Sequence, residues 1–210
     1  RVTGVQTCAL PIFFISRISV SVNGSLGSIF LGMRYSPESV EMGLYSGATK
    51  LSSAGEQMIP PLGDALYPSM VNKKDYRLFY RIVLRGGILW FLACGLVEVL
   101  ATPLCVLILG GQYASAGGFL RILMVGVFFG YFSFMFGYPA LSPIGKATWA
   151  NAAIMVSAIV NLTACAVLWL TGNITPLTVC VVFSSTNITT FIVRFGAFMK
   201  FRNLAEQDAE

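Results

Sequence analysis

The chain has 210 residues, of which 56% are hydrophobic and 11% are charged; its formal net charge is +5 and it contains no histidine. A soluble domain carries about 25% charged residues, so this composition excludes an ordinary soluble enzyme, a disordered chain and a nucleic-acid-binding protein. Without histidine, the commonest general base and metal ligand is missing. We therefore predict an all-α polytopic membrane protein that is not an enzyme, needs no cofactor and has membrane lipids around it.

The first twelve residues, RVTGVQTCALPI, resemble the in-frame translation of a common short-read sequencing adapter. We expect residues 1–12 to be a non-native addition and exclude them from the fold prediction; a polar start to the first helix is the alternative. The native chain would then be a fragment that has lost its upstream part. The cysteines after residue 12 lie in apolar runs without C-x-x-C spacing, which predicts small buried side chains.

Six segments are candidates to cross a bilayer, which takes about 20 residues of helix. In chain order they are 13–33, 40–70, 86–109, 118–138, 149–170 and 174–199. The first is rich in serine and glycine, and the second is semi-polar and interrupted by Pro60-Pro61, which would act as a hinge or as a static kink. The joining loops are short and rich in Pro, Gly, Ser and Asn, so they leave no room for a soluble domain.

Basic residues are distributed unequally between the two sides of these segments. Arg34 and Arg121 lie on one side. The opposite side carries Lys73, Lys74, Arg77, Arg81, Arg85, Lys146, Lys200 and Arg202. By the positive-inside rule, both ends of the six-helix unit are predicted to be cytoplasmic, with residues 200–210 as a polar cytoplasmic tail.

Polar residues inside the predicted spans are concentrated in the first two. Lys50, Gln57 and Asp64 recur every seven residues, so they would share one stripe if the helix continued through the two prolines. Arg17 lies on a polar face of the first segment with serine and glycine at helical spacing. Because an ionisable group in a bilayer costs about 3 kcal/mol, it usually faces a cavity or a partner.

We therefore predict that the first two segments line a water-filled path. The expected substrate contacts are Arg17, Asn23, Lys50 and Gln57. The expected ion-coupling carboxylates are Glu56 and Asp64, which could instead pair with the cations. Alternatively, Arg17 and Asp64 lie near the cytoplasmic ends and snorkel to the interface.

Other polar residues in the predicted spans do not require a substrate or ion path to explain them. Asn151, Asn161 and Asn187 are expected mainly to form hydrogen bonds between helices. Glu98 is either a coupling carboxylate or a partner of Arg121.

Four stretches of the chain follow one another in an order and spacing that resemble a known transporter family. They are EMGLYSGATKLSS (41–53), PPLGDALYPSMVNKKDYRLFYRIV (60–83), LILGGQYASAGGFLRIL (107–123) and GKATWANAAIMVSAIVNL (145–162). On these motifs the chain resembles the C-terminal half of polysaccharide flippases. These are the O-antigen-type translocases of lipid-linked oligosaccharides in the multidrug/oligosaccharidyl-lipid/polysaccharide exporter superfamily. The resemblance covers most of residues 13–199.

The resemblance implies one six-helix lobe of a twelve-helix transporter, with the missing N-terminal half and the glycan polymerase machinery as partners. Such a protein flips undecaprenyl pyrophosphate-linked oligosaccharides across the bacterial inner membrane by alternating access. Arg17 and Lys50 would then meet the pyrophosphate, and Glu56 would bind a coupling H⁺ or Na⁺. The alternatives are a lipid II flippase or multidrug exporter of the same superfamily, or a six-helix membrane enzyme of lipid-linked sugar metabolism.

Overall fold

A computed structural model describes residues 3–73 and 75–207 of the chain. It is 86% helical, and its described residues contain no strand. The elements are α1 Thr3–Gly32, α2 Val40–Glu56, α3 Ile59–Lys73, α4 Tyr76–Val99, α5 Ala101–Leu109, η1 Gly111–Tyr113, α6 Ala116–Met135, α7 Tyr138–Leu141, α8 Ala147–Leu170 and α9 Pro176–Gln207.

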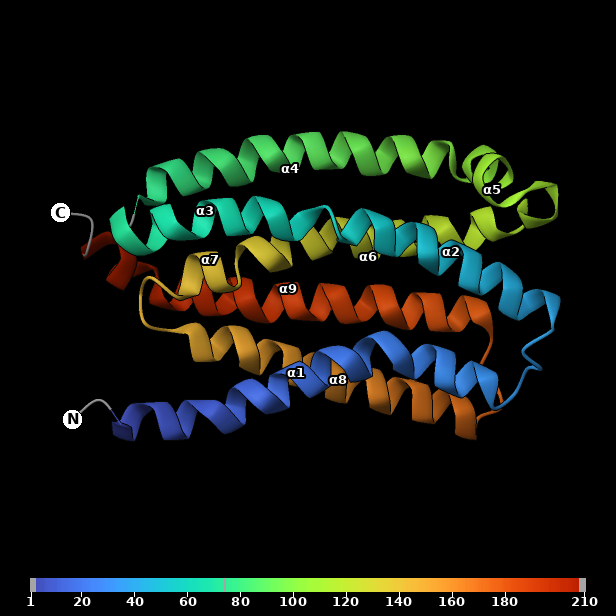
Figure 1. Ribbon diagram of the computed structural model, residues 1–210, viewed down its shortest axis with the longest axis horizontal. Helices are drawn as coiled ribbons and strands as arrows, with labels where there is room; N and C mark the ends of the chain where they lie inside the picture. The colour runs from blue at the N-terminus through green and yellow to red at the C-terminus, as the bar shows by residue number, and fades with distance from the viewer. Residues whose placement is uncertain (1–2, 74, 208–210) are drawn as a thin grey trace.

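The predicted all-α polytopic membrane fold is confirmed. In the described part of the chain, five helical segments are long and apolar enough to cross a bilayer. They are Phe14–Gly32, Tyr76–Val99, Ala116–Leu141, Ala147–Leu170 and Pro176–Phe201. The long helices run side by side along the longest axis of the molecule (Figure 1).

The second segment, 40–70, which the two prolines predict to be interrupted, is not one continuous helix. It is divided into α2 and α3, which lie end to end along the bundle (Figure 1). A continuous helix would need N–H groups at Pro60 and Pro61 to bond the carbonyls of Glu56 and Gln57, and proline has none. The prolines instead occupy the first turn of α3, where no such donor is required. Lys50 and Asp64 therefore lie on different helices, and the continuous helix that would have placed them on one stripe does not form.

Further boundaries differ from the prediction. The third span begins at Tyr76 instead of residue 86, because Asp75 caps α4 by accepting a 2.9 Å bond from the Leu78 N–H. The same span is interrupted at Leu100, between α4 and α5. At the chain ends, α1 extends back to Thr3, and α9 continues to Gln207 through most of the predicted tail. The origin of residues 1–12 stays a prediction.

The helix α6 lies at the centre of the bundle. It packs most extensively against α9, then against α2, α4 and α5, while α1 packs mainly against α8. The close approach of α6 to α9 depends on a small residue, because a Cβ on Gly126 would lie 3.1 Å from the Ser184 Cα. The cysteines at 94, 105, 165 and 180 are buried and free, as predicted.

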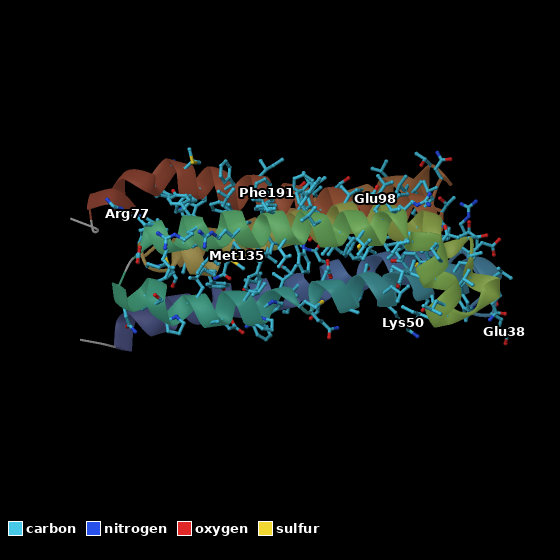
Figure 2. All side chains as sticks on the ribbon, turned by 90° about the horizontal axis from the view of Figure 1, so that it is seen from above. Glu38, Lys50, Arg77, Glu98, Met135 and Phe191 are labelled. Atoms are coloured by element: carbon cyan, nitrogen blue, oxygen red, sulfur yellow. The ribbon has the colours of Figure 1, made fainter. Side chains whose placement is uncertain are left out.

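The start of α1 and the end of α9 lie at the same end of the molecule (Figure 1). Arg77 lies towards that end, whereas Glu38 and Glu98 lie towards the opposite one (Figure 2). Arg77, the start of α1 and the end of α9 therefore share one side of the bundle.

Candidate functional site

Two adjoining cavities open between α1, α3, α6, α8 and α9. One has a volume of about 430 Å³ and the other about 780 Å³. We call them the Glu56 cavity and the Asp64 cavity, after the carboxylate that lines each. They share the lining residues Val20, Pro60, Phe134, Ile154 and Arg194. The shared wall makes them two parts of one polar space inside the helical bundle.

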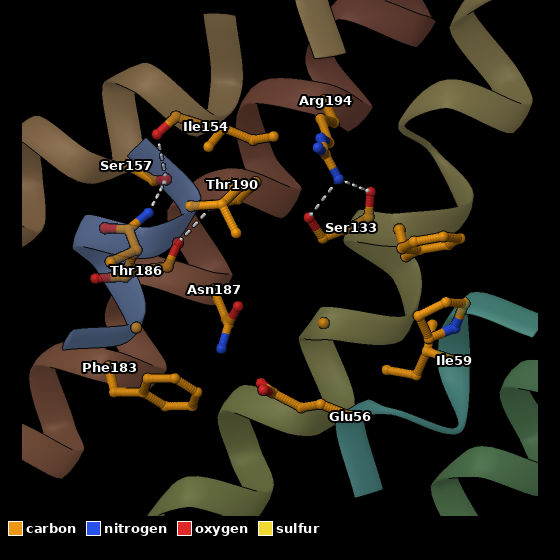
Figure 3. Close-up of a pocket in the computed structure, with 16 residues that line it drawn as sticks. Glu56, Ile59, Ser133, Ile154, Ser157, Phe183, Thr186, Asn187, Thr190 and Arg194 are labelled. Carbon is orange, nitrogen blue, oxygen red and sulfur yellow. Dashed lines mark hydrogen bonds between the residues drawn. The ribbon is translucent and has the colours of Figure 1, made fainter. Parts of the chain in front are cut away.

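The Glu56 cavity is lined by polar groups from α1, α2, α8 and α9. Glu56, the last residue of α2, is half-buried and points towards Asn187 on α9 (Figure 3). Thr186 and Thr190 lie one turn apart on the same helix and are joined by a 2.8 Å bond between the Thr190 hydroxyl and the Thr186 carbonyl. The carboxylate thus faces amide and hydroxyl groups that could take part in binding a polar ligand or a proton.

The Asp64 cavity brings together Arg17 from α1 and Asp64 from α3. Both side chains are exposed in the isolated chain. Across the cavity, the Tyr138 hydroxyl bonds the Asn151 side chain, which confirms the predicted interhelical role of Asn151. This cavity therefore presents two cations, Arg17 and Arg194, together with one anion and several hydroxyl groups.

Arg194 on α9 lies where the two cavities meet, and the sequence analysis missed it. It is buried, with 7% of its surface exposed. Its Nη1 donates to the Ser133 carbonyl at 2.8 Å and to the Ser133 hydroxyl at 3.4 Å (Figure 3). Its Nη2 donates to the Ala150 carbonyl at 3.3 Å. Its Nε has no hydrogen-bond partner among the described residues. A buried guanidinium thus links α6, α8 and α9 at the point where the two cavities meet.

The end of α6 explains why a cation is stable at this point. The helix ends at Met135, so the Ser133 carbonyl lacks the N–H donor that another helical turn would supply. The guanidinium takes that donor's place, and its charge lies at the negative end of the helix dipole. Gly137 makes room, because a Cβ there would lie 2.9 Å from the Arg194 Nη1. A count of ionisable residues within every apolar span would have found Arg194, since the run FIVRFGAFM contains no other charge.

The predicted site residues separate into two groups. Arg17 and Asp64 line the Asp64 cavity, and Asn23 and Glu56 line the Glu56 cavity. Lys50 and Gln57 line neither of the two cavities and are exposed, and Lys50 lies at the edge of the bundle (Figure 2). Within the part of the chain that the structure describes, Arg17, Lys50, Glu56 and Asp64 form no ion pair with one another.

Asn23 joins α1 to α8 through two polar partners. Its Nδ2 donates to the Ser157 hydroxyl at 3.1 Å, and its Oδ1 accepts from the Asn161 Nδ2 at 3.0 Å. This confirms that Asn161 forms a bond between helices, and it gives Asn23 a structural role at the edge of the Glu56 cavity.

We expect Asn161→Ala to lower the free energy of unfolding by about 1 kcal/mol, because hydrogen bonds between membrane helices contribute about 0.6 kcal/mol on average and at most about 1.7. A double-mutant cycle with Asn23→Ala, followed by equilibrium unfolding in mixed micelles, measures the coupling. Thr163→Val is the matched control, because the Thr163 hydroxyl bonds only carbonyls of its own helix, Ile159 and Val160. Strictly additive effects of the two alanine substitutions would contradict the assigned bond.

Outside the cavities, two arginines form hydrogen bonds to distant backbone carbonyls. Arg121 lies beside Glu98, as one alternative expected, but its Nε donates to the Glu98 backbone carbonyl at 3.3 Å. Arg34 donates to the Gly172 carbonyl at 2.6 Å and so ties the α1–α2 loop to the α8–α9 loop.

The described residues hold no group of three or more His, Cys, Asp or Glu side chains that could bind a metal ion. Comparison of the chain with protein-family models, curated proteins and solved structures finds no match. The fold and the cavities therefore define a helical, membrane-embedded protein with a polar internal space.

Proposed function

We propose that the chain is part of a transporter that moves lipid-linked oligosaccharides across the bacterial inner membrane by alternating access. The observation that carries this proposal is the pair of adjoining cavities, lined by Arg17, Glu56, Asp64 and Arg194. Ionisable groups within a membrane are costly and usually mark a substrate or ion path. A structural scaffold would gain nothing from four of them around one space.

The broken helix supports the same proposal. Pro60, in the first turn of α3, lines both cavities, so the interruption lies beside the polar space. Discontinuous helices in transporters expose backbone groups to substrates and let one part of the bundle move against another. We propose that α3 moves relative to α2 about Gln57 and Met58, and so opens the cavities to each side in turn.

The proposed roles follow from charge and position. Arg17 would bind the pyrophosphate, because a guanidinium can hold a phosphate with two parallel hydrogen bonds. Glu56 would bind the coupling H⁺ or Na⁺, since it is the half-buried carboxylate facing Asn187. The expected partner is a second six-helix half, and the side carrying Arg77 and the chain ends would be cytoplasmic.

Binding of an undecaprenyl pyrophosphate-linked oligosaccharide to the purified chain in nanodiscs tests the proposal. We expect Arg17→Gln to weaken binding about tenfold, because a hydrogen bond to a charged group contributes about 1.5 kcal/mol or more. Lys50→Gln is the matched control, since it removes one positive charge outside the two cavities.

Flipping by the reconstituted chain, together with its second half where one exists, then tests Glu56→Gln. We expect binding to persist while ion-driven flipping is lost. Equal binding by wild type and Arg17→Gln would overturn the assigned path. Tighter binding of a sugar-free amphipathic drug would instead favour a multidrug exporter, and tighter binding of lipid II would favour a lipid II flippase.

A further inference from the structure

The helix α4 lies at the edge of the bundle (Figure 1) and has two faces of different character. Its inner face is buried against the rest of the chain, mainly against α6, and includes Phe79, Val83, Gly87 and Cys94. Its outer face is exposed over the whole length of the helix. The outer face is therefore the part of α4 that the described residues of the chain leave uncovered.

Three arginines occupy the outer face near the start of α4. Arg77, Arg81 and Arg85 are spaced four residues apart, and all three are exposed. Each step of four residues advances about 6 Å along a helix and turns only about 40°, so the side chains form a row. We call these three residues the arginine row.

The arginine row lacks a negative partner in the described part of the chain. Its members form no hydrogen bond or ion pair there. The nearest acid in sequence, Asp75, accepts a bond from the Leu78 N–H as the cap of α4. The next acid along α4 is Glu98, at the opposite end of the helix. Like charges four residues apart on a helix repel, so an external anion would relieve this repulsion.

An apolar stripe continues the same face towards the middle of the bundle. Leu84, Ile88 and Leu92 are 66%, 56% and 60% exposed. They lie within about 80° of one another around the helix, on the same face as the arginines. Leu84 lies between Arg81 and Arg85 along the chain, and Ile88 and Leu92 lie beyond the arginine row. A row of cations followed by a strip of exposed aliphatic side chains matches the order of charge and hydrocarbon in a phospholipid.

We propose that the outer face of α4 is a binding site for an anionic phospholipid. The headgroup phosphate lies against the arginine row, where guanidinium groups bind it through paired hydrogen bonds. The acyl chains lie along the apolar stripe. The site is separate from the two cavities, and it does not depend on the transport proposal.

The test compares phosphatidylglycerol with phosphatidylcholine, each added to the purified chain in detergent. Native mass spectrometry counts the bound lipids, and the unfolding midpoint reports stabilisation. We expect phosphatidylglycerol to bind more tightly and to raise the midpoint. The triple variant Arg77→Gln, Arg81→Gln, Arg85→Gln should lose at least about tenfold in affinity, because each basic residue near a membrane surface contributes about 1 kcal/mol to binding of an anionic lipid.

The matched control is the triple variant Arg34→Gln, Lys50→Gln, Arg121→Gln, which removes the same charge outside the arginine row. It should keep the response to phosphatidylglycerol even if its own midpoint is lower. Three results would overturn the site: an equal response to both lipids, an unchanged response in the arginine-row variant, or equal protection by glycerol phosphate without acyl chains.

Discussion

Replacing Arg194 with methionine should lower the free energy of unfolding by about 3 kcal/mol. The substitution removes the donors to the Ser133 and Ala150 carbonyls, at 2.8 Å and 3.3 Å. Hydrogen bonds to charged groups contribute about 1.5 to 3 kcal/mol each, and a buried carbonyl left without a donor costs more than one exposed to water. Equilibrium unfolding in mixed micelles measures the change.

Two further variants separate the contributions of charge and geometry at this position. Arg194→Lys keeps the charge, but one ammonium group cannot reproduce the planar fork that joins α6 to α8, so an intermediate loss is expected. Lys50→Met removes an exposed charge from α2 and should change stability by less than about 0.5 kcal/mol. An Arg194→Met variant as stable as the wild type would contradict this prediction. It would show that the free-energy cost of burying the guanidinium equals the stabilisation from its hydrogen bonds.

The sequence was sufficient to predict the class of fold, because apolar spans and short polar loops depend on residues close together in the chain. The division of segment 40–70 into two helices was harder to predict from the sequence. Pro60-Pro61 signalled an interruption, but it did not say whether the helix would bend or stop. The answer depends on the missing donors for the Glu56 and Gln57 carbonyls. In the structure α2 ends at Glu56, where those donors would first be needed.

The candidate site was predicted in part, and there is a physical reason for each residue that the prediction misplaced or missed. Arg17, Asn23, Glu56 and Asp64 line the cavities because α1 and the junction of α2 and α3 both face the same space. A spacing of seven residues could not place Lys50, because it assumes one straight helix. Arg194 is recognisable as a single charge in an apolar span, but its role was not predictable, because its partners are backbone carbonyls of α6 and α8 that are distant in sequence.

Adjacent glycines at the start of α6 should respond oppositely to alanine. A Cβ on Gly117 would lie 2.7 Å from the Thr102 Oγ1, 2.9 Å from its Cα and 3.0 Å from its backbone nitrogen, whereas a Cβ on Gly118 meets nothing within 4 Å. Because Thr102 belongs to α5, Gly117→Ala can be accommodated only by moving one helix away from the other. Overpacking of this kind costs about 1 to 3 kcal/mol.

Gly118→Ala is the matched control for this prediction, one residue away on the same helix. It should leave stability unchanged or raise it by up to about 1 kcal/mol, because alanine is the better helix former. The same unfolding measurement on both variants should therefore show a difference of about 1 to 4 kcal/mol. Equal stability of the two would mean that α5 does not lie as close to α6 as the Thr102 contact requires. The short connection through η1 would then have to allow the two helices to separate.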